Sequence, residues 1–370
     1  MTRAAAPGGF PSLAADLKEA FTTWDGAPWP DGRFDELALR AFALQFETNA
    51  PYRAWCRARG AGPGTVRSWR DVPPVPTAAF RAVDLVAGPT DAAALTFLTS
   101  GTTGGAARRG RHLVLDPGLY RTSLRAAFRR FVLAGAPPVR ILTLVPPPTA
   151  APHSSLSWML EDVRQAFGAP GSRCLAGAEG IDWAALAAAL AAATADGSPV
   201  AVLGTTLALA AWADRREGAT GGPPLPPGSL VMDTGGTKGR AGLDRDAVLD
   251  CLLPALGLDA DRAVNEFGMT ELLSQRYARG RGPGLLHGPP WLRTAALDPV
   301  SLAPRPDGEE GILCHWDLAN AGSVLAVLTE DRGVVEDGTV RWLGRTPGAP
   351  PRGCSLATAE LLAAQERQDA

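Results

Sequence analysis

The sequence has few of the residues from which covalent and metal frameworks are built. Its 370 residues include five cysteines and four histidines. The cysteines, an odd number, are widely spaced without a C-x-x-C pair, and no two histidines stand at the spacing of metal ligands. These absences argue against a disulfide framework and a structural zinc site. Four of the cysteines lie in helical or strand patterns and are expected in the core: Cys56, Cys174, Cys251 and Cys314.

Charge of one sign and long apolar runs are also missing. The formal net charge is -2, and acidic and basic residues are scattered along the chain, so the electrostatic footprint of a nucleic-acid binder is absent. Residues 1–9 lack the apolar segment of a secretory signal, and apolar stretches such as Ala184–Ala193 are shorter than the ~20 residues that a bilayer requires. We therefore expect a cytoplasmic globular protein with no nucleic-acid partner and no membrane span.

Two familiar catalytic motifs do not occur. No glycine-rich stretch ends in G-K-[ST], which argues against a P-loop NTPase. No G-x-S-x-G elbow is present, so the adjacent His153 and Ser154 have no serine-hydrolase context. The function must be sought in other segments.

Apolar periodicity predicts an α/β protein. A helical pattern covers Leu13–Arg59, and short β-type runs then alternate with helical patterns as far as Leu256, as in a sheet covered by helices. Beyond Gly311, short strands follow one another through acidic and glycine turns. We expect three parts, namely an N-terminal helical region packed on the core (1–90), an α/β nucleotide- and acid-binding core (91–310) and a β-rich closing subdomain (311–370).

The segment Thr99–Gly104 is rich in hydroxyls and glycines and follows a predicted strand, Ala94–Thr99. Backbone N–H groups of such a turn can point inward, and its hydroxyls can bond phosphate oxygens. The segment is therefore a candidate triphosphate cradle. An ordinary hairpin loop has the same composition, so the string alone leaves both interpretations open.

A second segment, Asn265–Glu271, places an aromatic ring, a hydroxyl and a carboxylate within five positions. The ring can stack on a purine, the hydroxyl can bond a phosphate, and the Glu271 carboxylate can bind magnesium. A helix is expected to follow, so Glu271 as a plain acid at a helix N-terminus is the alternative.

Two smaller features also have competing interpretations. Gly235–Lys238 follows an apolar strand and could line an adenine pocket, with Lys238 either a mobile positive charge or a solvated turn residue. Asp331 precedes Arg332 and Gly333, and taken alone it is a good turn former.

The strings S-G-T-T-G (Ser100–Gly104) and E-F-G-M-T-E (Glu266–Glu271), in this order, resemble the adenylate-forming enzymes, which convert a carboxylate and ATP into acyl-AMP. Within that superfamily the chain is most similar to the acyl-protein synthetases of the LuxE type, which are related to phenylacetate-CoA ligases. Further matches occur at His153–Leu156, Gly235–Lys238, Gly268–Gln275, Asp317–Asn320, Thr329–Asp331, Gly344–Arg345 and Arg352–Leu356. The implied fold is an adenylate-forming α/β large domain, with mixed sheets flanked by helices, a short β-rich C-terminal subdomain and no full C-terminal lid domain.

The resemblance implies ATP and Mg²⁺ as cofactors and assigns roles residue by residue. The β- and γ-phosphates would be held by Ser100, Gly101, Thr102, Thr103 and Gly104. The rest of the nucleotide would be bound by Gly235, Gly236, Lys238, Phe267, Gly268, Thr270, Asp331 and Arg345, with Thr270 at the α-phosphate and Asp331 on the ribose hydroxyls. Glu271 would bind the magnesium ion. The acid pocket is expected near Pro146–Phe167 and to include His153, Ser155, Trp158 and Met159.

Cys354 stands in an R-G-C-S-L context like that of the cysteine that accepts the acyl group in the similar enzymes. Arg352 nearby could lower the thiol pKa, although a lone cysteine is more often a small buried apolar residue. The expected function is ATP-dependent activation of a carboxylic acid, with fatty acids as the implied class, and acyl transfer to Cys354 for delivery to a partner such as a reductase or carrier protein. The alternatives are an acyl-CoA or acyl-carrier ligase and a noncatalytic nucleotide-binding protein.

The chain departs from the classical pattern in two places. The usual proline, lysine and glycine after the loop are replaced by Gly105–Ala107, followed by Arg108, Arg109 and Arg111, which either supply phosphate charge or are solvated. The sequence also shows no pattern like that of the large C-terminal domain of the classical enzymes, which carries a catalytic lysine. The cation that stabilises the departing pyrophosphate is therefore not identified by the sequence.

Overall fold

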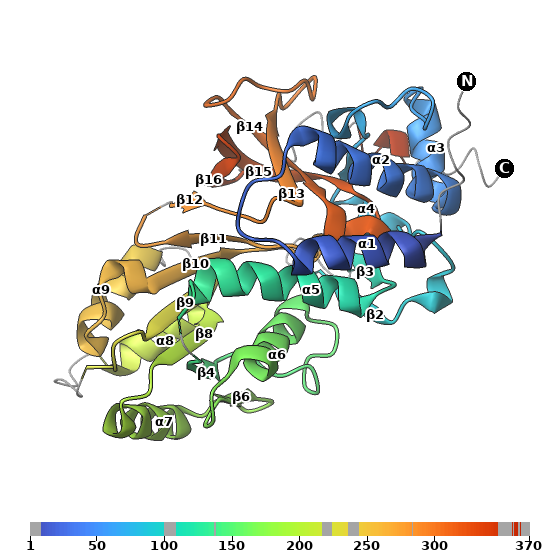
Figure 1. Cartoon of the computed structure of the whole chain (residues 1–370). Coiled ribbons are helices and arrows are strands. Elements are labelled where there is room, and N and C mark those ends of the chain that lie inside the picture. The colour runs from blue at the N-terminus through green and yellow to red at the C-terminus, as the bar shows by residue number, and fades with distance from the viewer. Residues whose placement is uncertain are drawn as a thin grey trace. The chain divides into compact units, whose positions relative to one another are not determined.

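The computed structural model of the chain describes residues 9–99, 109–136, 138–216, 224–235, 244–282 and 284–346, with positions 357, 359–361 and 363 (Figure 1). Its contacts define two compact units. The first unit comprises Met1–Ala126, Met269–Ser274 and Gly288–Ala370, and the second comprises Ala127–Gly268 and Gln275–His287. The three-part division expected from the sequence rests on other criteria and stays a prediction.

The first unit opens with helices. Its helical elements are α1 (Phe10–Thr22), α2 (Asp31–Thr48), α3 (Ala50–Ala58), α4 (Ala79–Ala82) and most of α5 (Pro117–Phe128), with the short turns η1 (Trp69–Asp71), η2 (Thr90–Ala92) and η5 (Leu318–Gly322). α1 and α2 pack on each other and on η5 (Figure 1). The helical pattern over Leu13–Arg59 is thus confirmed. The sequence also predicts the start of α5 from Asp116 as the cap and Pro117 as the first helical residue, and the Asp116 carboxylate indeed accepts the N–H groups of Gly118 and Leu119.

The main sheet of the first unit is antiparallel. Its strands run in the order β16 (Thr339–Arg345), β15 (Ala326–Glu336), β14 (Glu310–Asp317) and β13 (Leu292–Leu297), and β1 (Val75–Pro76) adds to β15 in parallel. A separate hairpin pairs β2 (Leu95–Leu98) with β3 (Arg111–Val114). The predicted strands beyond Gly311 are confirmed. The apolar run His112–Leu115 predicts a return strand after the glycine-rich loop, and β3 confirms it.

Long-range contacts close the core of this unit. The Gln45 side chain is fully buried; its amide donates to the carbonyl oxygens of Asn320 and Ala321, and its oxygen accepts the N–H of Leu325. The ring of Phe21 stacks on Trp291 with centroids 4.2 Å apart. A buried amide with every group bonded fixes α2 against the turn before β15, because any slip would leave polar atoms without partners.

The second unit is an α/β layer structure. Its strands are β4 (Arg140–Thr143), β5 (Arg173–Cys174), β6 (Ala176–Gly177), β7 (Gly180–Ile181), β8 (Val200–Thr205), β9 (Leu230–Thr234), β10 (Ala263–Phe267), β11 (Arg276–Arg279) and β12 (Leu285–Leu286). Its helical elements are α6 (Ser155–Phe167), α7 (Trp183–Asp196), α8 (Thr206–Arg216), α9 (Arg245–Leu256), η3 (Arg129–Leu133) and η4 (Ala260–Arg262). Its large sheet has the order β11-β10-β9-β8-β4-β5, parallel except for the antiparallel pair β10 and β11.

Local sequence explains these helices. Side chains of Ser154, Asp182 and Asp244 accept N–H groups at the first turns of α6, α7 and α9. α7 and α9 end at Gly197 and Gly257, both in the left-handed conformation that glycine adopts without steric cost. Leucines and alanines of α7, α8 and α9 pack in one buried cluster with β4, β8 and β9. The expected alternation of strands and helices is confirmed.

Candidate functional site

The glycine-rich loop can be followed only at its two ends, since Ser100–Arg108 lie outside the described residues. At its base Thr99 N–H donates to Gly110 O, and Gly110 N–H donates to the Thr99 hydroxyl, each across 2.9 Å. The Arg109 guanidinium donates to the carbonyl oxygens of Leu98 and Thr99. Arg111 pairs with Asp84. Both arginines therefore stabilise the base of the loop, which is a role that the sequence interpretation missed.

The Thr270–Glu271 turn, also in the first unit, is held through its backbone. His112 Nδ1 of β3 donates to Thr270 O across 2.7 Å, and Asn320 Nδ2 donates to Glu271 O across 2.8 Å. Asp317 accepts from the N–H groups of Leu273 and Ser274. No helix follows Glu271, contrary to the sequence expectation, since the chain continues as a turn to β11. The helix N-terminal interpretation of Glu271 is therefore wrong.

The Glu271 carboxylate is 8% exposed, and burial raises its pKa to about 7. The positive charges of Arg345 and Arg81 oppose that rise in pKa, and the negative charge of Asp331 adds to it. Arg81 also lies beside the base of the loop, because a Cβ on Gly110 would approach Arg81 Cγ to 3.4 Å and the Thr99 side chain to 2.9 Å. Two cations and two carboxylates thus lie close enough to influence one another's charge.

Asp331 lies inside β15 and is 5% exposed, so its interpretation as a turn former is wrong. Its Oδ1 accepts the indole N–H of Trp342 across 3.2 Å, and its own N–H donates to the Thr329 hydroxyl. Arg345 stands opposite Asp331 on β16, with Nε 3.7 Å from Oδ1.

In the second unit, a polar cluster forms where β9 and β10 end side by side. The Thr234 hydroxyl bonds the Glu266 carboxylate, and these residues are paired in the parallel register. Asp233 accepts from the Asn265 amide at 2.9 Å and from Arg245 Nε at 2.9 Å. Burial raises the pKa of Glu266 to about 7.

At two positions of the same edge, backbone conformation or lack of space favours glycine. Gly235 has φ +77°, a left-handed conformation, and its carbonyl accepts the Thr206 hydroxyl across 2.8 Å. A Cβ on Gly268 would lie 2.5 Å from a Glu266 carboxylate oxygen. Gly268 is exposed and Phe267 is half-buried beside it. This edge can therefore offer bare backbone and a ring face to a flat ligand.

The residues expected around the acid lie at the start of α6. His153 is exposed, Ser155 and Trp158 are half-buried, and Met159 is 3% exposed. Ser155, Trp158 and Met159 share one helix face by their spacing. Their role stays a prediction.

Part of the predicted site cannot be placed. Outside the described residues lie the loop residues Ser100, Gly101, Thr102, Thr103 and Gly104, the adenine-side residues Gly236 and Lys238, and Cys354. The described residues hold no group of three or more His, Cys, Asp or Glu side chains that could bind a metal ion. None of the helices in the described parts of the chain combines the length and apolarity of a transmembrane span.

Sequence reasoning missed several residues of these clusters. Arg81 and His112 had no motif to mark them, and only the β2–β3 hairpin and α4 bring them to Glu271. Asp233 and Thr234 directly precede Gly235 at a strand end, a position that could have drawn attention to them.

The fold is that of the adenylate-forming acyl-CoA synthetase-like enzymes, as the sequence predicted. A 2-hydroxyisobutyryl-CoA ligase in an open conformation with 2-HIB-AMP and CoA superposes with a TM-score of 0.61 at 17% identity, covering 95% of this chain and 81% of that one. The McyG A-PCP structure with phenylalanyl-adenylate gives a TM-score of 0.50 at 16% identity over 69% of this chain and 47% of that one. At these identities the similarity establishes the fold alone.

Sequence similarity to the LuxE-type enzymes is confirmed over a short segment. The chain is 32% identical over 85 residues to a long-chain-fatty-acid–luciferin-component ligase of Aliivibrio fischeri, over 20% of this chain and 22% of that enzyme. It is 31% identical over 84 residues to the enzyme of the same name from Vibrio harveyi, over 21% and 22% of the two chains. The matched segment thus spans about a fifth of the relatives' length. No family model matches the chain.

Proposed function

We propose that this protein activates a carboxylic acid with ATP to give an acyl-adenylate. The observation that carries this proposal is the His112–Thr270 hydrogen bond, which holds the base of the hydroxyl- and glycine-rich loop next to the Glu271 turn. In the proposed site, phosphate donors of this loop and the metal-binding carboxylate of Glu271 would act together, as adenylation requires. The fold of ligases that bind acyl-adenylates supports the same conclusion.

In the proposed reaction, a carboxylate oxygen of the acid attacks the α-phosphorus of ATP. The bond from the α-phosphorus to the bridging oxygen breaks, and pyrophosphate leaves. Mg²⁺, held by Glu271, would offset negative charge on the phosphates. Asp331 would accept the ribose hydroxyls. Phe267 and Gly268 keep the adenine role that the sequence resemblance implies.

Arg81 is our candidate for the cation that the departing pyrophosphate needs. It is exposed, it lies beside Thr99 and Gly110, and its charge acts on Glu271. No carboxylate of the described residues lies within ion-pair distance of it. Arg345, which is 60% exposed and pairs with Asp331, is the second cation.

The acyl group is then proposed to pass to Cys354. The thiolate attacks the acyl carbonyl, the bond to the AMP oxygen breaks, and AMP leaves with the negative charge. Fatty acids are the proposed substrates because the sequence relatives are long-chain-fatty-acid ligases. A reductase or carrier protein is the proposed final acceptor.

Acid-dependent exchange of labelled pyrophosphate into ATP tests adenylation. Exchange with a fatty acid is expected in the presence of Mg²⁺ and should be lost in Glu271→Gln. Absence of exchange with fatty, aromatic and amino acids alike would leave the noncatalytic nucleotide-binding alternative.

Transfer is tested separately by incubation with ATP and labelled acid without coenzyme A. Label that is removable by neutral hydroxylamine and absent from Cys354→Ala supports the acyl-enzyme. Full labelling of that variant, or acyl transfer only to added coenzyme A, contradicts it and favours the CoA-ligase alternative.

A further inference from the structure

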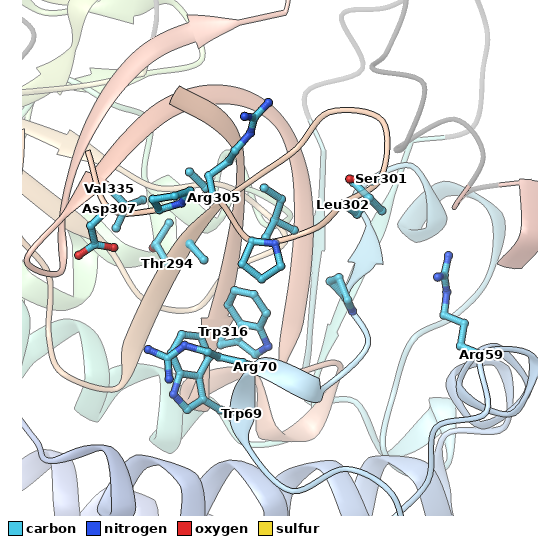
Figure 2. A pocket seen from close by; sticks show the side chains of 16 residues that line it. Arg59, Trp69, Arg70, Thr294, Ser301, Leu302, Arg305, Asp307, Trp316 and Val335 are labelled. Atoms are coloured by element: carbon cyan, nitrogen blue, oxygen red, sulfur yellow. The ribbon is translucent and has the colours of Figure 1, made fainter. Parts of the chain in front are cut away.

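A pocket of about 310 Å³ lies on the sheet of the first unit and shares no residue with the clusters described above (Figure 2). Its floor is formed by Thr294–Leu297 of β13 with Trp316 and Val335 of the next two strands. Trp69 and Arg70 of η1 form one wall, and the loop Ser301–Asp307 covers the opposite side. Its volume is at the lower end of small-molecule sites, which begin near ~300 Å³.

The covering loop is fixed by hydrogen bonds within itself and by one to the sheet. One oxygen of Asp298 accepts the N–H of Val300 and both the N–H and the hydroxyl of Ser301, and the other accepts Arg305 Nη2 at 2.7 Å. Arg305 N–H donates to Ala296 O at 2.9 Å. Small side chains at Ala295 and Ala296 leave the space beneath it open. The hydrogen-bonded loop and the small residues beneath it therefore form the cavity together.

Leu302 lines the pocket with a backbone φ of +59°, a left-handed conformation that costs a branched residue about 1–2 kcal/mol. The loop would relax with glycine at this position. Leu302 thus contributes an apolar wall to the pocket at a conformational cost.

The walls and the charges of the pocket define the kind of ligand it fits. Trp69 and Trp316 are each 3% exposed and meet edge to face with centroids 4.8 Å apart, so they present a small and rigid area of aromatic surface to the pocket. Arg70 lies over Trp69 at 4.3 Å from its ring centroid. An apolar body can rest on the indoles while its polar head reaches Arg70.

The charge of the ligand can be inferred from the ion pairs that the arginines lining the pocket already form. Arg305 pairs with Asp298 at 2.7 Å and Arg59 pairs with Glu360 at 2.6 Å. Arg70 lies 3.7 Å from Asp31, whose other oxygen is bonded more closely by Arg293. Arg70 is therefore the lining arginine whose ion pair is the longest, so its charge is the least neutralised of the three.

Asp307 adds a negative charge at the rim without an ion-pair partner among the described residues. The single positive charge of the guanidinium balances the negative charge of one carboxylate. A phosphate dianion beside Asp307 would leave negative charge without a positive partner. We propose that this pocket binds a small monocarboxylate with an apolar body, its head on Arg70 and its body between Trp316 and Leu302. This site is separate from the proposed acid-activation site and does not depend on ATP.

The probe is 3-phenylpropanoate, titrated without nucleotide and followed by the indole N–H signals of Trp69 and Trp316, each assigned by its Trp→Phe variant. Both signals should shift saturably. The matched cation 3-phenylpropylammonium has the same ring but no acceptor, so it should shift neither. No saturable shift with the acid, or equal shifts with the amine, would overturn the proposal.

Variants locate the binding. Arg70→Gln should weaken binding by about tenfold or more, because it removes the charged partner of the head group. Leu302→Gly also should weaken it, and since glycine tolerates the backbone conformation, loss of binding cannot be attributed to misfolding. Arg40→Gln, at an exposed ion pair elsewhere, should bind like the parent. Binding that survives Arg70→Gln but is lost in Trp158→Ala would assign the probe to the predicted acid pocket and refute the proposal.

Discussion

His112 Nδ1 donates a hydrogen bond to the carbonyl oxygen of Thr270 across 2.7 Å. Since a carbonyl only accepts, the imidazole proton is on Nδ1. Burial lowers the pKa of His112 to about 4, and the bond to Thr270 opposes that change, so the ring stays neutral near pH 7. The hairpin that carries the glycine-rich loop is thereby joined to the turn that carries Glu271 by a bond that neutral pH does not break.

Replacing His112 by Ala should lower pyrophosphate exchange by about tenfold to a hundredfold, because the Thr270 carbonyl loses its donor and the turn loses its position. His112 acts through the position of the turn and does not touch the nucleotide in the proposed site. A displaced turn should change both the Michaelis constant for ATP and the maximal rate. His287→Ala, which alters an exposed side chain, is the control. Exchange by His112→Ala at the parent's rate would mean that the turn is positioned without this bond.

Arg81→Ala should reduce the maximal exchange rate by about tenfold or more, because charge on the departing pyrophosphate loses its partner. Arg81→Lys should recover part of the rate, and added guanidinium should partly rescue Arg81→Ala. Arg53→Ala, which removes an arginine bonded to the Glu47 carbonyl, should leave exchange unchanged. An active parent together with a fully active Arg81→Ala would reject Arg81 while leaving the adenylation proposal intact.

Glu266 should make stability fall as the pH rises. Burial raises its pKa from 4.5 to about 7, so between these values the folded protein holds a proton that the unfolded chain has released. The free energy of unfolding then decreases with pH across that window, by up to about 3 kcal/mol for this group. Glu266→Gln removes this dependence, so urea unfolding at pH 5 and pH 8 should show the variant gaining on the parent at the higher pH. An unchanged difference between the two pH values would contradict the raised pKa.

Asp317→Asn should destabilise the first unit by about 2–4 kcal/mol. The Asp317 carboxylate is fully buried and accepts from Leu273 N–H, Ser274 N–H, the Ser274 hydroxyl and Ala319 N–H. Asparagine would put an NH2 group in place of one carboxylate oxygen. That group would face hydrogen-bond donors and could not accept from them. Asp307→Asn, in the rim of the pocket, should change the unfolding free energy by less than about 0.5 kcal/mol. Similar losses in the two variants would show that the buried acceptor is not the cause.

The secondary structure was predictable where the signal is local. Caps such as Asp116 and Asp182 and the apolar runs of β8 and β9 indicate element type through short-range chemistry. The errors arose where distant contacts dominate. The residues after Glu271 have no helix because their N–H groups donate to Asp317, 43 and 44 residues further along the chain.

The candidate site was predictable only in its motif residues. Glu271 and Asp331 stand in strings that match a known pattern, whereas Arg81 and His112 are ordinary residues in a short helix and a return strand. Their proximity to Glu271 follows from the packing of the β2–β3 hairpin, and a single sequence holds no periodicity that reports it. The pocket beside Trp69 is likewise formed by segments that are remote in sequence.

The hydrogen bond from Leu325 N–H to the Gln45 oxygen joins residues 280 positions apart. During synthesis on a ribosome, α2 is complete long before that partner has been made, while the second unit is built from a nearly continuous stretch of chain. The apolar faces of the N-terminal helices therefore stay exposed to solvent until the residues near 325 have been made. Nascent chains stalled before residue 325 should recruit chaperones and proteases.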